Sequence, residues 1–480
     1  MKVKQYETVI GLEVHVELAT KTKIFCSCST KFGGESNTHT CPVCTGMPGS
    51  LPVLNKQVVE YAIAVGLATN CSISKFSRFD RKNYFYPDNP QNYQISQLYF
   101  PICRNGEINI KTEIGEKTIG IHEIHMEEDA GKLIHDEEEA STLIDYNRSG
   151  VPLIEIVTEP DMESAEEVNA FLDKLRLIIQ YLGASDCKLN EGSMRVDVNL
   201  SVRELGAKEY GTRTEMKNLN SFKAMVRAIE NERERQIELL EEDKKVVLET
   251  RRWDDHKGVS YSMRSKEDAL DYRYFPEPDL VALVISDEWI EEIQNRQPEL
   301  PEAKQFRYKK EFGIPEYDIN LITSSKYLAN IFEETIALCH KPKEVSNWIM
   351  VETMRLLKEN AVEAEEISFS PKNLAKLIDL IDNNVINRMV ARDVFEEIFK
   401  KDVDPEDYVK DNGLTTIVDK DAIREIIKKV ISENAQSIED IKSGKVKVKG
   451  YLMGQTMKVM GGKADPDIVR EILEEVLGWI

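Results

Sequence analysis

The sequence lacks long apolar runs and lacks an overall excess of positive charge. No stretch approaches the roughly 18 consecutive apolar residues of a membrane span, and the N-terminal MKVKQYETVIGLEV has no signal-peptide organisation. These absences predict a cytoplasmic protein with no membrane association. The formal net charge of −22 argues against a chain that is basic throughout and coats nucleic acid, so charge must be judged region by region.

Motifs of several enzyme classes are also missing. The dipeptide Gly131-Lys132 lacks the flanking residues of a GxxxxGK[ST] phosphate loop, and neither GxGxxG nor the nucleophile motif GxSxG occurs. No covalent nucleophile is therefore indicated. We expect any chemistry to be metal-assisted, with carboxylates holding Mg²⁺ against a phosphorylated substrate.

Cysteine is scarce, but four of the eight cysteines lie close together in the sequence. The pair Cys26-Ser-Cys28 is separated by a short loop from the pair Cys41-Pro-Val-Cys44. Two close pairs suit a tetrahedral Cys₄ zinc site, although the first pair is CxC rather than CxxC. Two disulfides or chance spacing are the alternatives. We predict structural Zn²⁺ bound by Cys26, Cys28, Cys41 and Cys44.

The composition is that of a globular protein, with 480 residues of which 41% are hydrophobic and 31% charged. Residues 11–18, GLEVHVEL, alternate apolar and polar side chains, which predicts a half-buried β-strand. Glu13, His15 and Glu17 share its polar face. Carboxylate and imidazole suit Mg²⁺, Mn²⁺ or Zn²⁺, although an ordinary solvated strand face has the same alternation.

A similar pattern recurs in IHEIHMEEDAGK, which begins at residue 121. His125, Glu127 and Asp129 alternate with other residues, and Glu128 enlarges the acidic cluster. Glu155 stands alone in the apolar run LIEIV. Such a carboxyl group should be paired, protonated or metal-bound, unless it points to solvent from an edge strand.

Two further segments have the polar character of ligand-binding regions. Residues 79–97, FDRKNYFYPDNPQNYQISQ, are rich in Tyr, Asn, Gln and Pro, which is typical of a binding loop. An ordinary tyrosine-rich loop is the alternative. An alternating strand is predicted for residues 193–203, and its polar face suits a ligand with phosphate or carboxylate groups. That face carries Arg195, Asp197, Asn199, Ser201 and Arg203.

These patterns predict an α+β fold with three domains. Residues 1–292 form a strand-rich mixed domain, which we call the cradle because its polar strand faces and loops line a concave site. Residues 293–405 follow the linker-like QPELP and are almost entirely helical in pattern. Residues 406–480 form a small helical tail domain.

One segment of the tail is basic. Between residues 442 and 463 there are six lysines, five glycines and no acidic residue. Such a flexible, basic surface suits contact with a phosphate backbone, although a solvated loop is the alternative. The lysines are Lys442, Lys445, Lys447, Lys449, Lys458 and Lys463.

Six motifs in order resemble the B-subunit family of the bacterial aspartyl/glutamyl-tRNA(Asn/Gln) amidotransferases, the GatB/GatE family. They are ETVIGLEVHVEL, FDRKNYFYPDNPQNYQISQ, HMEEDAGK, DYNRSGVPLIEIV, EGSMRVDVNLSVR and DYRYFPEPDL. The likeness runs along nearly the whole chain. The tail, including VKGYLMGQTMKVMGGKADP, is similar to the YqeY-like domain that ends that family.

The resemblance implies a ligase that acts on misacylated tRNA. In the family, the B subunit uses ATP and Mg²⁺ to phosphorylate the side-chain carboxylate of Glu-tRNA(Gln) or Asp-tRNA(Asn). Ammonia from an amidase (A) subunit then displaces phosphate, and a small (C) subunit completes a heterotrimer. The basic tail segment would bind the tRNA.

The residue patterns and the resemblance together give candidates for each role. Glu13, His15, Glu127 and Glu128 are the expected catalytic residues and Mg²⁺ ligands. Asp145 and Glu155 are the next Mg²⁺ candidates. The expected contacts to ATP or the aminoacyl end are Arg81, Lys82, Tyr84, Tyr86, Asn89, Ser193, Arg195, Asp197, Asn199 and Arg203.

Two other functions are compatible with parts of the sequence. A non-catalytic, tRNA-binding scaffold protein would tolerate substitution in the acidic cluster. A metal-dependent phosphohydrolase acting alone would have no need of the basic tail or the helical domain. Because clustered like charges are costly, an enzyme explains them better than a scaffold does.

Overall fold

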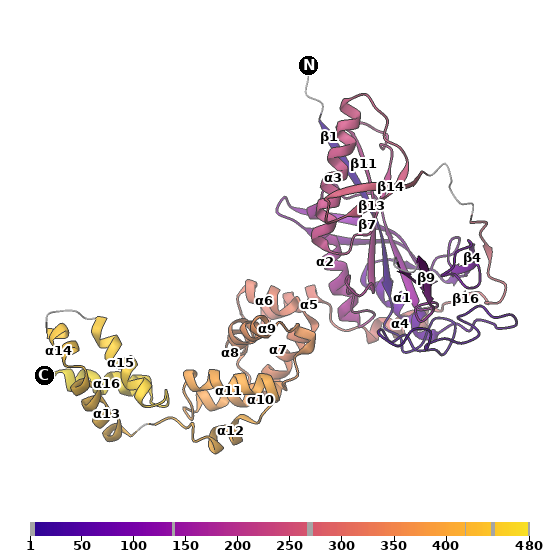
Figure 1. Ribbon diagram of the computed structural model, residues 1–480. Helices are drawn as coiled ribbons and strands as arrows, with labels where there is room; N and C mark the ends of the chain where they lie inside the picture. The colour runs from indigo at the N-terminus through magenta and orange to yellow at the C-terminus, as the bar shows by residue number, and fades with distance from the viewer. Residues whose placement is uncertain (1–4, 137–139, 266–271, 418, 443–446, 479–480) are drawn as a thin grey trace. The chain divides into compact units, whose positions relative to one another are not determined.

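The computed structural model describes residues 5–136, 140–265, 272–417, 419–442 and 447–478. The chain forms two compact units, residues 1–300 and 301–480 (Figure 1). The first is rich in strands and the second is helical, which confirms the predicted α+β fold. The domain boundary predicted at residue 292 falls inside helix α4 (Asp287–Arg296), whose Ile293 belongs to the core of the first unit.

A nine-stranded sheet forms the centre of the first unit, in the order β14-β13-β12-β11-β1-β10-β7-β6-β2. Neighbouring strands are antiparallel, except that β12 and β13 run parallel. The strands are β1 (Tyr6–Glu17), β2 (Ser72–Ile73), β6 (Cys103–Lys111), β7 (Glu116–Glu128), β10 (Pro152–Thr158), β11 (Met194–Glu204), β12 (Thr214–Lys217), β13 (Glu249–Asp254) and β14 (Val259–Ser265).

Three further helices of this unit begin where the sequence provides capping residues. The side chains of Asn55, Ser164 and Ser221 each accept a hydrogen bond from a backbone N–H of the first turn. The apolar sides of these helices share one core with the large sheet (Figure 1). The helices are α1 (Lys56–Ala68), α2 (Ala165–Leu182) and α3 (Phe222–Glu241).

Strand β1 lies inside the sheet, because it pairs with β10 on one side and with β11 on the other. Leu12, Val14 and Val16 are fully buried and belong to the core shared with the helices. Successive side chains leave opposite faces of a strand, so Glu13 and His15 project from the other face of the sheet. The predicted alternation in this stretch is confirmed.

Small sheets and hairpins complete the first unit. The predicted binding loop of residues 79–97 contains the hairpin of β4 and β5, so it is more regular than we expected. The backbone N–H of Met126 in β7 donates to the side chain of Gln97, which ties this hairpin to the large sheet. The small sheets contain β3 (Phe76–Ser77), β4 (Asp80–Asn83), β5 (Tyr93–Ser96), β8 (Lys132–Asp136), β9 (Ser141–Asp145), β15 (Phe275–Pro276) and β16 (Leu283–Val284).

The second unit consists of short helices. Its last helices enclose a hydrophobic cluster that includes Ile423, Leu452 and Ile472. The helices are α5 (Pro301–Glu311), α6 (Glu316–Thr323), α7 (Lys326–Cys339), α8 (Pro342–Asn347), the π-helix η2 (Trp348–Thr353), α9 (Met354–Asn360), the 3₁₀-helix η3 (Ala364–Glu366), α10 (Pro371–Asp382), α11 (Arg388–Lys401), α12 (Pro405–Asp411), α13 (Lys420–Glu433), α14 (Ala435–Lys442), α15 (Lys447–Val459) and α16 (Pro466–Gly478). Among the described residues, none of the helices combines the length and apolar character needed to cross a bilayer.

Candidate functional site

The register of the large sheet aligns ionisable side chains on the polar face of β1. His15 lies opposite Glu155 of β10 on one side and opposite Arg195 of β11 on the other. Glu155 in turn lies opposite His125 of β7. Directly opposed residues of antiparallel strands project from the same face, so these four side chains form one row across the sheet.

The first ligand cluster consists of His15, Glu127 and Glu155. One ligand atom from each of the three lies within 4.8 Å of the others. His15 Nε2 is 3.5 Å from Glu127 Oε1 and 3.4 Å from Glu155 Oε2. On the other side of Glu155, His125 Nε2 is 3.0 Å from Oε2. Two carboxylates and an imidazole at these distances fit a divalent cation.

The charges inside this cluster determine its protonation. Burial alone would lower the pKa of His15, but the hydrogen bond to Glu155 and the charge of Glu127 outweigh burial and raise it. Burial alone would raise the pKa of Glu155, but the two histidines hold it well below its usual range. These shifts favour imidazolium beside carboxylate in the free cluster, and a bound cation would compete with a proton for the nitrogen of His15.

A second ligand cluster consists of Glu13, Asp197 and Glu215, whose ligand atoms also lie within 4.8 Å of one another. Lys217 Nζ is 2.5 Å from Asp197 Oδ2 and 2.8 Å from Glu215 Oε1. The amide of Asn199 donates to Glu13 Oε1 at 3.0 Å. Burial and the neighbouring carboxylates raise the pKa of Glu13. Three carboxyl groups with one lysine leave an excess of negative charge that a second divalent cation would compensate.

Members of both clusters line one cavity of about 990 Å³. Lys82 and Arg195 also line it and bring positive charge beside the acidic clusters. Burial would lower the pKa of Lys82, but the charge of Glu127 and other nearby acidic groups outweighs burial and raises it. A large cavity with two candidate cation sites and fixed positive side chains suits a phosphorylated ligand.

Arg195 is held in place by a buried carboxylate. Its Nη2 is 2.8 Å from Asp129 Oδ2, and Arg148 Nε is 3.5 Å from the same oxygen. Arg148 is itself fixed, because it donates to the backbone carbonyls of Ala130 and Gly131. Burial would raise the pKa of Asp129, but the two arginines lower it. Asp129 is therefore a positioning residue for the guanidinium of Arg195.

The four clustered cysteines have the geometry of a metal site. Their Sγ atoms lie within 4.8 Å of one another, and those of Cys41 and Cys44 are 3.9 Å apart. A zinc tetrahedron with bonds of about 2.3 Å has edges of about 3.8 Å. A disulfide would require about 2.05 Å, and all eight cysteines are free. The arrangement therefore fits zinc and speaks against the disulfide alternative.

Glu128 does not join the ligand clusters, contrary to our expectation. It follows Glu127 at the end of β7 and therefore leaves the strand on the other face. There its Oε1 accepts hydrogen bonds from Gln91 Nε2 at 2.5 Å and from the backbone N–H of Ile95 at 3.0 Å. Burial raises the pKa of Glu128 to about 8. Glu127 and Glu128 are adjacent in the sequence, but the pleat of the strand directs their side chains to opposite faces of the sheet.

Asp145 also lies outside both clusters. Its Oδ1 accepts hydrogen bonds from the backbone N–H groups of Asn37 at 3.0 Å and Asn147 at 2.9 Å. These bonds connect the cysteine-bearing loop to the segment after β9. Asp145 is thus engaged in holding backbone, and among the described residues it belongs to none of the groups of metal-binding side chains.

The predicted contacts to ATP or the aminoacyl end divide into three groups. Some are placed at the cavity, either on its wall or on the second cluster: Lys82, Tyr84, Arg195, Asp197 and Asn199. Arg81 is instead paired with Glu277 at 2.6 Å and with Asp279 at 3.0 Å. Arg203 is paired with Glu7 near the far end of β11.

The remaining three predicted contacts do not line the cavity. Tyr86 is exposed to solvent. Asn89 Nδ2 donates to the backbone carbonyl of Tyr84 at 3.0 Å and so supports a residue of the cavity wall. The hydroxyl of Ser193 donates to Asp186 at 2.5 Å.

The basic tail segment is more regular than the flexible surface that we expected. Helix α15 spans Lys447–Val459 and includes Gly450 and Gly454. Lys458 is exposed, and Lys463 Nζ donates to a backbone carbonyl at 2.9 Å. Lys445 and the side chains of Lys442 and Lys447 lie outside the described residues, and Lys449 is half-buried.

Sequence reasoning missed several members of the site. His125 lies in the alternating acidic stretch, but only its acidic neighbours were assigned roles. Glu215 and Lys217 alternate within the strand TEMK, which is too short to give a clear periodic signal. Asp129 was noticed as part of the acidic cluster, but its pairing with Arg195 depends on strands that are distant in sequence.

Comparisons with known proteins agree with this architecture. A model described as the GatB/GatE catalytic domain matches residues 8–291, and one described as the GatB domain matches residues 330–477. The B subunit of the aspartyl/glutamyl-tRNA(Asn/Gln) amidotransferase of Agathobacter rectalis is 69% identical over 474 residues, covering 99% of this chain and 100% of the relative. The corresponding B subunits of Lachnospira eligens and Caldicellulosiruptor bescii are 64% and 60% identical, over 99% and 98% of this chain and 100% and 99% of their own lengths. The resemblance seen in the six motifs is confirmed, and the chain belongs to the GatB/GatE family.

Proposed function

We propose that this chain, a component of a ligase-type tRNA amidotransferase, uses ATP and Mg²⁺ to phosphorylate the side-chain carboxylate of Glu-tRNA(Gln), Asp-tRNA(Asn) or both. The phosphorylated carboxyl group is then amidated with ammonia from a partner glutaminase subunit. One observation carries the proposal: two clusters of metal-binding side chains and several cationic side chains meet at a single cavity. The aminoacyl-tRNA substrates are taken from the relatives, which are named aspartyl/glutamyl-tRNA(Asn/Gln) amidotransferases.

The chemistry matches the side chains that the site provides. A carboxylate reacts poorly with ammonia, and phosphorylation gives it a good leaving group. Phosphoryl transfer depends on positioning and charge neutralisation more than on a covalent protein nucleophile. Divalent cations, when bound, supply most of that neutralisation. The first cluster would hold one cation and the second cluster another.

The cationic side chains would complete the binding of phosphate. Arg195 and Lys82 face the cavity from different elements, β11 and β4, and would bind phosphate oxygens from two directions. Asp129 would keep the guanidinium of Arg195 oriented before the ligand arrives. Lys217 would balance the charge of the second cluster whenever a cation is absent.

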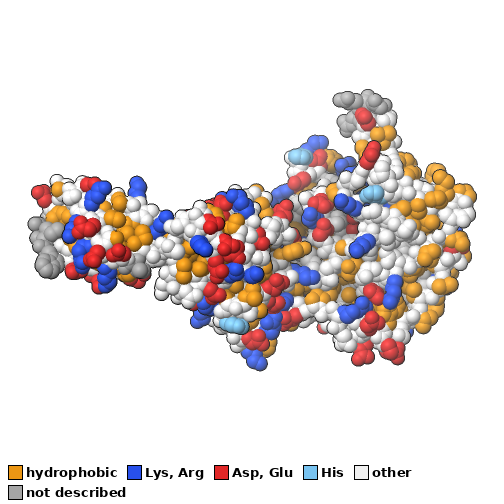
Figure 2. Space-filling view, turned by 90° about the horizontal axis from the view of Figure 1, so that it is seen from below, with side chains coloured by type: hydrophobic (Ala, Val, Ile, Leu, Met, Phe, Trp, Pro, Cys, Tyr) orange, Lys and Arg blue, Asp and Glu red, His pale blue; other side chains and the backbone are white. Residues whose placement is uncertain are grey.

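Other parts of the chain would serve binding rather than chemistry. All four ligand positions of the zinc site are cysteines, so zinc there would be structural. Hydrophobic side chains gather on the surface of the first unit (Figure 2), and Val53 and Phe85 are 74% and 85% exposed. We assign such surface to the amidase and small partner subunits. The lysines of the tail would bind the tRNA body.

The test is ATP hydrolysis to ADP by the chain assembled with its amidase and small subunits, with and without Glu-tRNA(Gln). Glu127→Ala removes a member of the first cluster. Glu116→Ala is the matched control, because it changes an exposed glutamate at the other end of the same strand. Turnover should require the charged tRNA, persist in Glu116→Ala and disappear in Glu127→Ala. Unchanged turnover in Glu127→Ala would refute the assignment, and tRNA binding without any turnover would favour a non-catalytic scaffold.

A further inference from the structure

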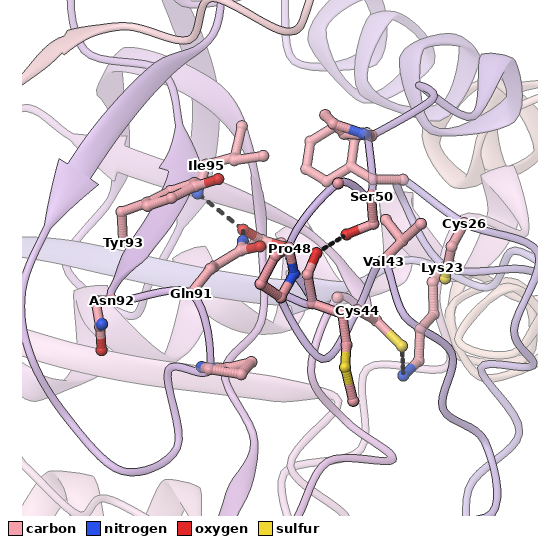
Figure 3. Close-up of a pocket in the computed structure, with 18 residues that line it drawn as sticks. Lys23, Cys26, Val43, Cys44, Pro48, Ser50, Gln91, Asn92, Tyr93 and Ile95 are labelled. Carbon is pink, nitrogen blue, oxygen red and sulfur yellow. Dashed lines mark hydrogen bonds between the residues drawn. The ribbon is translucent and has the colours of Figure 1, made fainter.

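Lys23 is a completely buried lysine beside the cysteine quartet. Its exposed fraction is 0%. Its Cδ lies 3.6 Å from the position that a Cβ atom on Gly150 would take, so the aliphatic part of the side chain packs beside that glycine. Its Nζ donates to the Sγ of Cys44 at 3.4 Å and to the backbone carbonyl of Tyr146 at 3.2 Å, and Figure 3 shows the amine directed at the sulfur. Within the described chain, no carboxylate oxygen lies within 4.0 Å of this Nζ.

A buried ammonium group needs an anionic partner. Removing such a charge from water without compensation is strongly unfavourable in a protein interior. The carbonyl of Tyr146 supplies a hydrogen bond but no charge. The sulfur of Cys44 is therefore the available anion, and it carries negative charge when it binds a metal.

A zinc site with four cysteines supplies the negative charge that the ammonium group of Lys23 needs. Zn²⁺ with four thiolates has a net charge of −2, which is itself unfavourable in a buried position. An N–H donor to one of the sulfurs reduces that charge and fixes the orientation of the ligand. Each group thus compensates for a cost that the other would bear alone.

We propose that Lys23 is the charge-balancing partner of the zinc-bound cysteine quartet and sets how tightly the metal is retained. This inference depends on the proposed zinc site and not on the proposed reaction. It assigns to the lysine an effect that reverses when the sulfurs are removed. With the zinc-bound thiolates in place, the ammonium stabilises the fold, and without the sulfurs it is a buried charge with no counter-charge.

The experiment measures zinc release from the full chain to a coloured chelator. Lys23→Met keeps the length of the side chain and removes the charge. Lys21→Met makes the same change two residues earlier at an exposed position, so it is the matched control. Zinc should leave Lys23→Met roughly 10–100-fold faster than wild type, as expected when a hydrogen-bonding partner of a metal ligand is lost. Lys21→Met should match wild type.

Metal analysis of the wild-type chain tests the zinc site separately from the role of Lys23. A chain purified without zinc that also fails to take it up would refute the zinc site itself. A chain that contains zinc, with equal release rates for wild type and a folded Lys23→Met, would refute the role of Lys23 alone.

A second comparison covers the case in which Lys23→Met does not fold with zinc. Replacing Cys26, Cys28, Cys41 and Cys44 by serine removes the anionic sulfurs and leaves the ammonium without a counter-charge. In this background Lys23→Met should raise the melting temperature, because it removes an uncompensated buried charge. A lower melting temperature, or loss of folding in both backgrounds, would show that the lysine acts independently of the thiolates and would overturn the inference.

Discussion

The cysteine quartet and the His15–Glu127–Glu155 cluster are both sets of metal-binding side chains, but they are assembled in different ways. The four cysteines lie between residues 26 and 44 on one loop segment. The members of the other cluster come from three strands, β1, β7 and β10, and they meet only because those strands are adjacent in the sheet. The first set depends on local chain geometry, and the second depends on the whole sheet.

This difference determines what each site can contribute. A loop closed by four thiolates offers a metal no free position, so it can hold the fold but cannot bind a substrate. Carboxylates and imidazole on a sheet face leave the cavity side open. They are also held by strands whose other faces are packed in the core, which keeps their positions fixed. Variants of each set should therefore have effects of different kinds.

Among the conservative variants that separate the two sites, the largest effect on activity should come from Glu155→Gln, which keeps the shape of the side chain and removes the charge that His15 and His125 share. We expect tRNA-dependent ATP turnover to fall on the order of 1,000-fold, because a fixed electrostatic group of the site is lost. Steady-state assays at saturating ATP and Mg²⁺ measure it. Glu159→Gln, at a half-exposed glutamate just beyond β10, is the control. Equal activity of Glu155→Gln and Glu159→Gln would show that the His15–Glu127–Glu155 cluster matters no more for turnover than a glutamate outside it.

A smaller loss should follow Glu215→Gln in the second cluster. Two carboxyl groups of that cluster remain, so we expect turnover to fall on the order of 100-fold. The Mg²⁺ concentration needed for half-maximal activity should also rise. A titration of Mg²⁺ against ATP turnover tests both points, with the exposed Glu209→Gln as control. An unchanged Mg²⁺ dependence would argue that the second cluster binds no cation.

Removing the proposed zinc site at the cysteine quartet should affect stability more than activity. Cys41→Ser should lower the melting temperature of the first unit, because metal binding to the folded loop contributes to folding. At a temperature where the variant stays folded, ATP turnover should remain within about twofold of wild type, since a metal held by four cysteines has no open position for a substrate. Calorimetry and the turnover assay distinguish these outcomes. A large loss of turnover in a fully folded variant would show that the two sites are coupled.

The smallest effect concerns Glu128, which lies on the cysteine side of β7. Burial raises its pKa in the folded chain to about 8, from an ordinary value of 4.5. The folded state thus keeps a proton that the unfolded state releases above pH 4.5, so stability falls as the pH rises toward 8. Glu128→Gln lacks this dependence and should gain roughly 1–3 kcal/mol relative to wild type between pH 5 and pH 8. Urea unfolding at both pH values measures the difference. If the difference in unfolding free energy between Glu128→Gln and wild type were the same at pH 5 and pH 8, the raised pKa of Glu128 would be contradicted.

The same contrast explains what could be predicted from the sequence. The proximity of the four cysteines could be predicted, because their spacing within one loop specifies which side chains meet. The alternation in residues 11–18 correctly predicted which side chains of β1 face the site. Alternation could not reveal the strand order, so the partnership of Glu13 with Glu215 stayed hidden. Glu128 was misplaced because its charge resembles that of Glu127, while the pleat of β7 directs it elsewhere.

The central position of β1 also has a consequence for synthesis of the protein. The ribosome completes β1 at residue 17, but its neighbours β10 and β11 end only at residues 158 and 204. At about 5–20 residues per second, roughly 10–40 s separate the first strand from the second of its neighbours. During that interval Leu12, Val14 and Val16 have no sheet to join. The nascent strand therefore needs shielding by a chaperone or by collapsed parts of the emerging chain until β11 has been translated.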